Sequence, residues 1–114
     1  MTRVLVAEDC APVLRIIAGA LRTKGWDVVG VDRVEDAKAA PGPWDFMVID
    51  FGLPNGDGRQ IAEHWSGVPH LFVSGEIGME LDELVRTRRL LRKPFTAAQL
   101  CTAIEERLQR EVAR

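Results

Sequence analysis

The chain has 114 residues, a length that suits one domain with one compact core. Hydrophobic residues make up 46% and charged residues 28%, with a formal net charge of −2, so no bulk charge attracts nucleic acid or an anionic membrane. No apolar stretch reaches the length of a membrane span or of a signal peptide, and the two cysteines, Cys10 and Cys101, have no metal-ligand spacing. We therefore expect a cytoplasmic protein that binds neither nucleic acid nor membrane.

Short apolar runs alternate with helical patterns along the whole chain. The apolar runs predict strands at Arg3–Ala7, Asp27–Asp32, Phe46–Asp50, His70–Ser74 and Leu90–Arg92. The helical patterns lie at Pro12–Lys24, Val34–Ala40, Asp57 to Trp65, around Met79–Thr87, and from Thr96 onward. A glutamine stands three residues after Asp57 and another three residues after Thr96. This spacing predicts capping boxes at the third and last helices, respectively.

This alternation predicts an α/β fold with a parallel sheet that is covered by helices on both faces. Right-handed crossover connections leave few topologies for such a sheet. We expect residues 1–114 to form a single domain.

Polar side chains follow four of the predicted strands. Glu8 and Asp9 follow the first strand, Asp50 ends the third, Ser74 ends the fourth, and Lys93 follows the fifth. Ligands of open parallel sheets bind beyond the carboxyl ends of the strands, so we expect these side chains to converge at one edge.

Three carboxylates at one edge repel one another. Two of them about 4 Å apart cost roughly 4 kcal/mol at an effective dielectric constant near 20. Either some of the carboxyl groups stay protonated or a cation lies among them, and Mg²⁺ suits such oxygen ligands. A carboxylate beside Mg²⁺ can also act as a nucleophile and form an acyl phosphate, with Lys93 and the metal supplying positive charge.

Four motifs carry a resemblance to a known family. They are Glu8-Asp9, Asp50-x-x-Leu53-Pro54-x-x-Asp57-Gly58, Ser74-Gly75 and Lys93-Pro94-Phe95. In this order they resemble the bacterial response-regulator receiver domains of the chemotaxis-regulator type. The resemblance covers the whole chain and implies a flavodoxin-like, doubly wound sheet with strand order 2-1-3-4-5.

The resemblance also implies a role for each site residue. Asp50 would accept a phosphoryl group from a histidine of a sensor kinase or of a histidine phosphotransfer protein. Asp9, Asp50 and the backbone carbonyl of Gly52 would bind Mg²⁺ directly, and Glu8 would bind it through water. The protein would be a phosphorylation switch of a two-component or phosphorelay pathway rather than an enzyme with an external substrate, although it would promote its own phosphorylation and dephosphorylation.

Three further positions complete the implied switch. Lys93 would pair with the phosphoryl group, and Pro94 would follow it through a cis peptide bond. Ser74 would move toward the phosphoryl group and pull the next loop. No output domain follows the last predicted helix, so we expect signalling by contact with a downstream protein, from a monomer or a weak homodimer.

The chain departs from the family pattern at several places. Leu90 occupies the position at which the family usually has a tyrosine or phenylalanine that signals phosphorylation. The intervals from Asp50 to Ser74 and from Ser74 to Lys93 are short for the family, which predicts trimmed third and fourth helical regions. Gly52 and Glu76 occupy the two positions that, in the family, affect the access of water to the acyl phosphate. The small Gly52 predicts an open site with quick self-dephosphorylation.

These departures keep other hypotheses open. One alternative is an interaction module that works without phosphorylation, and another is a phosphate sink without a target of its own. A phosphatase that uses an aspartyl phosphate generally has a second aspartate two residues after the nucleophile, where this chain has Gly52. The basic run Arg86–Lys93 is interpreted as the solvated end of a helix, with docking of an acidic partner as an open alternative.

Overall fold

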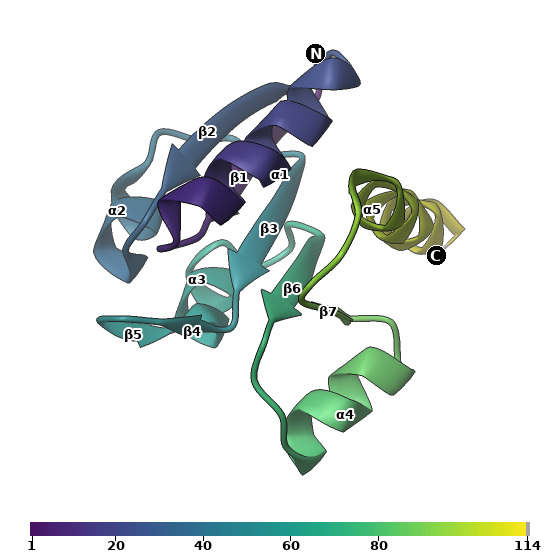
Figure 1. Ribbon diagram of the computed structural model, residues 1–114. Coiled ribbons are helices and arrows are strands. Elements are labelled where there is room, and N and C mark those ends of the chain that lie inside the picture. Colours follow the sequence, from purple (N-terminus) through teal and green to yellow (C-terminus); the bar gives the residue numbers. More distant parts are fainter. Residues whose placement is uncertain (114) are drawn as a thin grey trace.

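The computed structural model describes the backbone of residues 1–113 and the side chains of residues 1–110, so Arg114 of the predicted domain lies outside the described part. A five-stranded parallel sheet forms the centre of the fold (Figure 1). Its strands, in spatial order, are β2 (Asp27–Val31), β1 (Arg3–Ala7), β3 (Phe46–Asp50), β6 (His70–Ser74) and β7 (Leu90–Arg92). The predicted order 2-1-3-4-5 is confirmed, because β6 and β7 are the fourth and fifth strands of this sheet.

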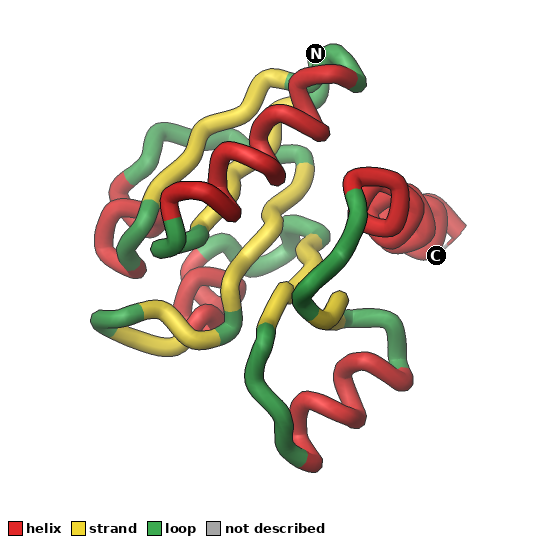
Figure 2. The backbone as a smooth tube through the Cα atoms, in the orientation of Figure 1, coloured by secondary structure: helices red, strands yellow, loops and turns green. Residues whose placement is uncertain are grey.

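Helices cover both faces of the sheet (Figure 2). They are α1 (Ala11–Thr23), α2 (Val34–Ala39), α3 (Gly58–His64), α4 (Met79–Arg86) and α5 (Ala97–Ala113). None of the described helices is long and apolar enough to cross a membrane. Their bounds agree with the predicted ones to within about a residue or two, which is the usual uncertainty of helix ends.

The two faces of the sheet bury two separate apolar clusters. Alternate residues of a strand point to opposite faces, so Val4 and Val6 pack under α1 and α5 while Leu5 and Ala7 pack under α2, α3 and α4. The side chains that α1 and α5 contribute are Ile17, Leu21, Leu100 and Ile104. Those on the other face include Ala37, Ile61 and Leu81.

Both capping boxes are present. At α3 the Asp57 side chain accepts from the Arg59 N–H at 2.8 Å, while Gln60 Oε1 accepts from the Asp57 N–H at 3.1 Å. At α5 the hydroxyl of Thr96 and the amide of Gln99 make the same reciprocal exchange, at 3.0 and 2.8 Å. The sequence spacing therefore located both helix starts.

The segment after Asp50 is more regular than its composition predicts. Instead of a loop alone, it forms a two-stranded antiparallel hairpin from β4 (Gly52–Leu53) and β5 (Gly56–Asp57). The burial of Leu53, which is 6% exposed, anchors the hairpin to the core, and this contact is tertiary rather than local.

Close backbone packing explains why a glycine, Gly58, follows the hairpin. A Cβ added at Gly58 would lie 2.5 Å from the backbone oxygen of Asp50 and 3.2 Å from Cα of Phe51. The start of α3 thus passes directly against the backbone of the site, where only glycine fits. The third and fourth helices are short, with seven and eight residues.

Candidate functional site

Asp50 is the buried end of the central strand β3. All five residues of this strand are buried, and Asp50 is 7% exposed. Its Oδ1 accepts a hydrogen bond from the Gly52 N–H at 3.2 Å, and its Oδ2 accepts one from Lys93 Nζ at 3.2 Å. Both carboxylate oxygens are therefore held in place at the carboxyl edge of the sheet.

Glu8 and Lys93 complete a buried charge cluster around Asp50. Glu8 is 0% exposed, and its Oε2 accepts from the backbone N–H of Cys10 at 3.2 Å. Lys93 Nζ lies 2.5 Å from Glu8 Oε1, which is an ion-pair contact without hydrogen-bond geometry. One ammonium thus lies between two carboxyl groups.

The cluster perturbs the acid and base strengths of its members. The pKa of Glu8 is raised from 4.5 to about 7, chiefly by burial and also by the nearby carboxyl group of Asp50, while Lys93 opposes the rise. Burial lowers the pKa of Lys93, but the close contact with the Glu8 carboxylate and the charge of Asp50 outweigh it and raise that pKa above its ordinary value. One positive charge is therefore too little for two buried carboxylates.

The residues present fit a divalent cation. Glu8, Asp9 and Asp50 each offer a carboxylate oxygen, and these atoms lie within 4.8 Å of one another. Glu8 Oε1 is fully buried and accepts no hydrogen bond within the described part of the chain. Asp9, by contrast, is exposed, so an ion can reach the cluster from solvent. Hard oxygen ligands with an open side are the donor set that suits Mg²⁺.

Ser74 and Lys93 are linked by backbone. The Lys93 N–H donates to the carbonyl of Ser74 at 2.8 Å, and the peptide bond from Lys93 to Pro94 is cis. The side chain of Ser74 is 1% exposed, and its Oγ accepts from the Glu76 N–H at 3.0 Å. In this structure the hydroxyl is therefore engaged with the loop after β6.

Gly52 and Glu76 face each other at the mouth of the site. A Cβ added at Gly52 would lie 2.5 Å from Glu76 Oε1, so the Glu76 carboxylate occupies the space beside Gly52. The expectation that a small Gly52 leaves this side of the site open is corrected here, because a residue from another loop fills the space. Glu76 is exposed and flexible enough to move away.

Leu90 lies in the core and away from the charge cluster. It is 4% exposed and belongs to the apolar cluster that also contains Phe72 and Leu81. The side chain has no polar atom, so it cannot exchange a hydrogen bond between two positions.

Two arginines of this region were missed by sequence reasoning. Arg92 lies on β7 and pairs with Asp82 of α4, so the interpretation of its basic run as a solvated helix end is wrong for this residue. Arg59 pairs with both Asp57 and Glu80, and its guanidinium lies 5.2 Å from the centre of the Phe51 ring. The only sequence signal for Arg92 was its position directly before Lys93.

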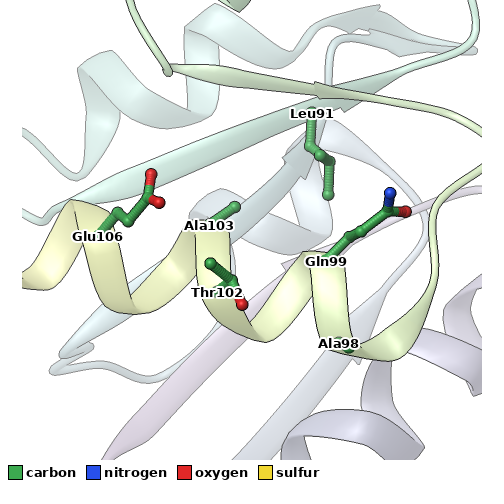
Figure 3. Close-up of a pocket in the computed structure, with 6 residues that line it drawn as sticks. All are labelled: Leu91, Ala98, Gln99, Thr102, Ala103 and Glu106. Carbon is green, nitrogen blue, oxygen red and sulfur yellow. The ribbon is translucent and has the colours of Figure 1, made fainter.

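A hollow lies between β7 and α5, and its lining includes no residue of the charge cluster (Figure 3). It is lined by Leu91, Ala98, Gln99, Thr102, Ala103 and Glu106. Glu106 is its one ionisable lining residue among those described, so the hollow has no set of groups for chemistry.

Relatives of known identity match the chain as a whole. No family model matches it. It is 30% identical to the KDP operon transcriptional regulatory protein KdpE of Escherichia coli, over 99% of this chain but 54% of that protein, and thus spans about half the length of KdpE. It is 28% identical to the response regulator receiver protein CpdR of Brucella abortus, over 95% of this chain and 98% of that protein. Over its whole length the chain is therefore similar to response-regulator receiver proteins.

Solved structures support the same fold. A CheY-like receiver domain from Methanospirillum hungatei superimposes with a TM-score of 0.83 at 19% identity, covering 99% of this chain and 98% of the other. The receiver domain of a diguanylate cyclase from Desulfovibrio desulfuricans superimposes with a TM-score of 0.81 at 23% identity, over 99% and 98% of the two chains. The predicted receiver fold is therefore confirmed, and the relatives named above support the predicted family.

Proposed function

We propose that this receiver accepts a phosphoryl group on Asp50 and passes on the signal by protein contact. The donor would be a phosphohistidine of a sensor kinase or of a histidine phosphotransfer protein. The observation that carries the proposal is the buried cluster in which Lys93 Nζ contacts both Asp50 and Glu8, beside the exposed Asp9.

The transfer itself is a displacement at phosphorus. A carboxylate oxygen of Asp50 forms the new P–O bond, the P–N bond of the phosphohistidine breaks, and the imidazole nitrogen leaves with the bonding pair. Catalysis of such a step consists mostly of positioning and charge stabilisation. The hydrogen bonds from Gly52 and Lys93 position the Asp50 carboxylate before any donor arrives.

Positive charge must also balance the incoming phosphoryl oxygens. Lys93 carries one charge, and its raised pKa keeps it protonated at neutral pH. Glu8, Asp9 and Asp50 would hold Mg²⁺, which when bound supplies further positive charge to the phosphoryl oxygens. Ser74 lies at the end of the adjacent strand, where its hydroxyl could donate to a phosphoryl oxygen once it releases Glu76.

Intact-mass spectrometry with a small-molecule donor tests this proposal. The chain is incubated with acetyl phosphate in the presence and absence of Mg²⁺, and Asp50→Asn serves as the matched control of equal size. We expect the mass of one phosphoryl group to be gained by the unmodified chain with Mg²⁺ only. An equal gain in Asp50→Asn would refute Asp50 as the acceptor, and an equal gain without Mg²⁺ would refute the role of the metal.

A further inference from the structure

Helix α4 is joined to other elements by ion pairs as well as by apolar packing. It lies at the end of the molecule beyond β7 in Figure 1, and Leu81 is its buried residue. Its first turn carries two acids that pair with arginines elsewhere: Glu80 pairs with Arg59 of α3, and Asp82 pairs with Arg92 of β7. These two arginines therefore tie α4 to the rest of the domain.

Arg92 differs from Arg59 in what else it contacts. Besides the pair of its Nη2 with Asp82, its Nη1 donates to the backbone carbonyl of Glu76 at 3.1 Å. It also directly precedes Lys93 at the end of β7. Its side chain is 36% exposed, so a large part of it is shielded from solvent. One guanidinium thus joins the edge strand, the loop after β6 and helix α4.

Hydrogen bonds hold both the backbone N–H and the backbone carbonyl of Glu76. Its N–H donates to Ser74 Oγ at 3.0 Å, and its carbonyl accepts from Arg92. The Lys93 N–H in turn donates to the carbonyl of Ser74 at 2.8 Å. These contacts close a ring that runs from the Ser74 hydroxyl through Glu76, Arg92 and Lys93 back to Ser74. The Ser74 hydroxyl and the Arg92 guanidinium thus contact the same residue, Glu76.

We propose that Arg92 couples the Asp50 site to helix α4. It would take over the role of the aromatic side chain that the family usually has at the position of Leu90. The inference rests on the proposed phosphorylation of Asp50. When the Ser74 hydroxyl turns toward a phosphoryl group, the Glu76 N–H loses its acceptor and the Glu76 carbonyl leaves Arg92. The guanidinium then changes its contact with Asp82, and α4 shifts toward the second of two states that differ in these contacts.

A double-mutant cycle tests the coupling without any phosphoryl group. Hydrogen exchange of the α4 amides is measured in Ser74→Ala, Arg92→Ala and the double variant. We expect Ser74→Ala to speed exchange by about threefold or more in the unmodified background and to have little effect when Arg92 is already absent. Additive effects of the two substitutions would overturn the proposal.

Glu80→Gln provides the matched control. It removes the other ion pair of the same helical turn, but Arg59 makes no contact with the ring of Ser74, Glu76 and Arg92 among the hydrogen bonds of the described residues. The effect of Ser74→Ala on α4 should therefore persist in the Glu80→Gln background. Asp82→Asn, by contrast, should abolish this effect as Arg92→Ala does.

An NMR titration with Mg²⁺ and beryllofluoride, a mimic of the phosphoryl group, separates the coupling from the proposed function. In the unmodified chain we expect amide shifts at residues 9, 50 and 93 and throughout α4. In Arg92→Ala the site shifts should remain while the α4 shifts fall, and equal α4 shifts in both proteins would overturn the coupling. A non-additive cycle together with no beryllofluoride response at the site would support the coupling and refute the proposed function.

Discussion

Glu8 shows how strongly the fold can alter one carboxyl group. Its pKa is raised from 4.5 to about 7, chiefly by burial. A folded-state pKa above the unfolded value means that the folded protein binds more protons between these two pH values. The contribution of Glu8 to the free energy of unfolding is therefore greatest at low pH and declines as pH rises from about 4.5 to about 7.

The variant Glu8→Gln should remove this decline. We expect the free energy of unfolding of the metal-free protein, measured with urea at several pH values across that window, to fall with pH in the unmodified chain and to fall much less in Glu8→Gln. Asp9→Asn is the control, because Asp9 is an exposed neighbour in the same cluster. The same pH dependence in the unmodified chain and in Glu8→Gln would show that Glu8 is not the titrating group.

The contact between Gly52 and Glu76 suggests how a side chain introduced at residue 52 would change the lifetime of the phosphorylated chain. Any Cβ at residue 52 displaces the Glu76 carboxylate, which is the end of a flexible, exposed side chain. Gly52→Arg adds a long cation that can pair with the displaced Glu76 and cover Asp50 from water. We expect Gly52→Arg to lengthen the lifetime of the phosphorylated chain.

The lifetime is measured as the loss of phosphoryl mass after the donor is removed. Gly52→Ala separates the two effects of the substitution, since it displaces Glu76 without covering the site. We expect its lifetime to stay close to that of the unmodified chain. An unchanged lifetime in Gly52→Arg would mean that water reaches the phosphoryl group from another side.

At the scale of elements, the junction between β3 and α3 holds Asp50 in place. The Gly58 N–H donates to the carbonyl of Phe51 at 2.9 Å, and a Cβ at Gly58 would meet backbone atoms that cannot rotate away. Gly58→Ala should therefore displace α3 or the backbone of Asp50. We expect a loss of about 1–3 kcal/mol in the free energy of unfolding, together with slower phosphorylation of Asp50.

Gly19→Ala is the matched control for this substitution. Gly19 lies inside α1, and nothing is within 4 Å of a Cβ added there. An alanine in an exposed helix interior should raise the free energy of unfolding by up to about 1 kcal/mol. If chemical denaturation gives both variants the same stability as the unmodified chain, the close approach at Gly58 is not strained.

The elements also show where sequence patterns suffice. The five strands and five helices were predicted because each carries its own apolar period or capping pair, such as Asp57 with Gln60. The β4–β5 hairpin was not predicted, because it has two residues per strand and depends on the burial of Leu53 in the core. Short elements that are held by tertiary contacts show no hydrophobic periodicity in the sequence.

At the scale of the whole molecule, a bound ion should stabilise the fold. An ion that binds only the folded chain adds RT ln(1 + [L]/Kd), or about 2.7 kcal/mol at a hundredfold excess over Kd. The unfolded chain does not bring Glu8, Asp9 and Asp50 together, since β1 and β3 meet only in the sheet. We therefore expect Mg²⁺ to raise the Tm.

Asp9→Asn should abolish most of this rise in Tm while leaving the metal-free Tm nearly unchanged, because Asp9 is exposed. Calorimetry with and without Mg²⁺ measures both values. An equal rise in the unmodified chain and in Asp9→Asn would place the ion elsewhere. Binding should also strengthen as pH rises toward about 7, since a protonated Glu8 must lose its proton to take part.

Local patterns were enough to place the strands, the helices and the polar residues at the strand ends. They also predicted that Glu8, Asp9, Asp50 and Lys93 would meet, because parallel strands bring their carboxyl ends to one edge. This inference needed no side-chain geometry. It depended on strand direction, which the alternation of strands and helices already implied.

Side-chain partners were decided only by tertiary packing. The position of Glu76 over Gly52, and the contacts of Arg92 with Glu76 and Asp82, join segments that have no common periodicity. A long flexible side chain such as arginine can reach many groups, and its sequence neighbours do not select among them. The selection follows from where α4 and the loop after β6 come to lie against β7, which only the folded chain establishes.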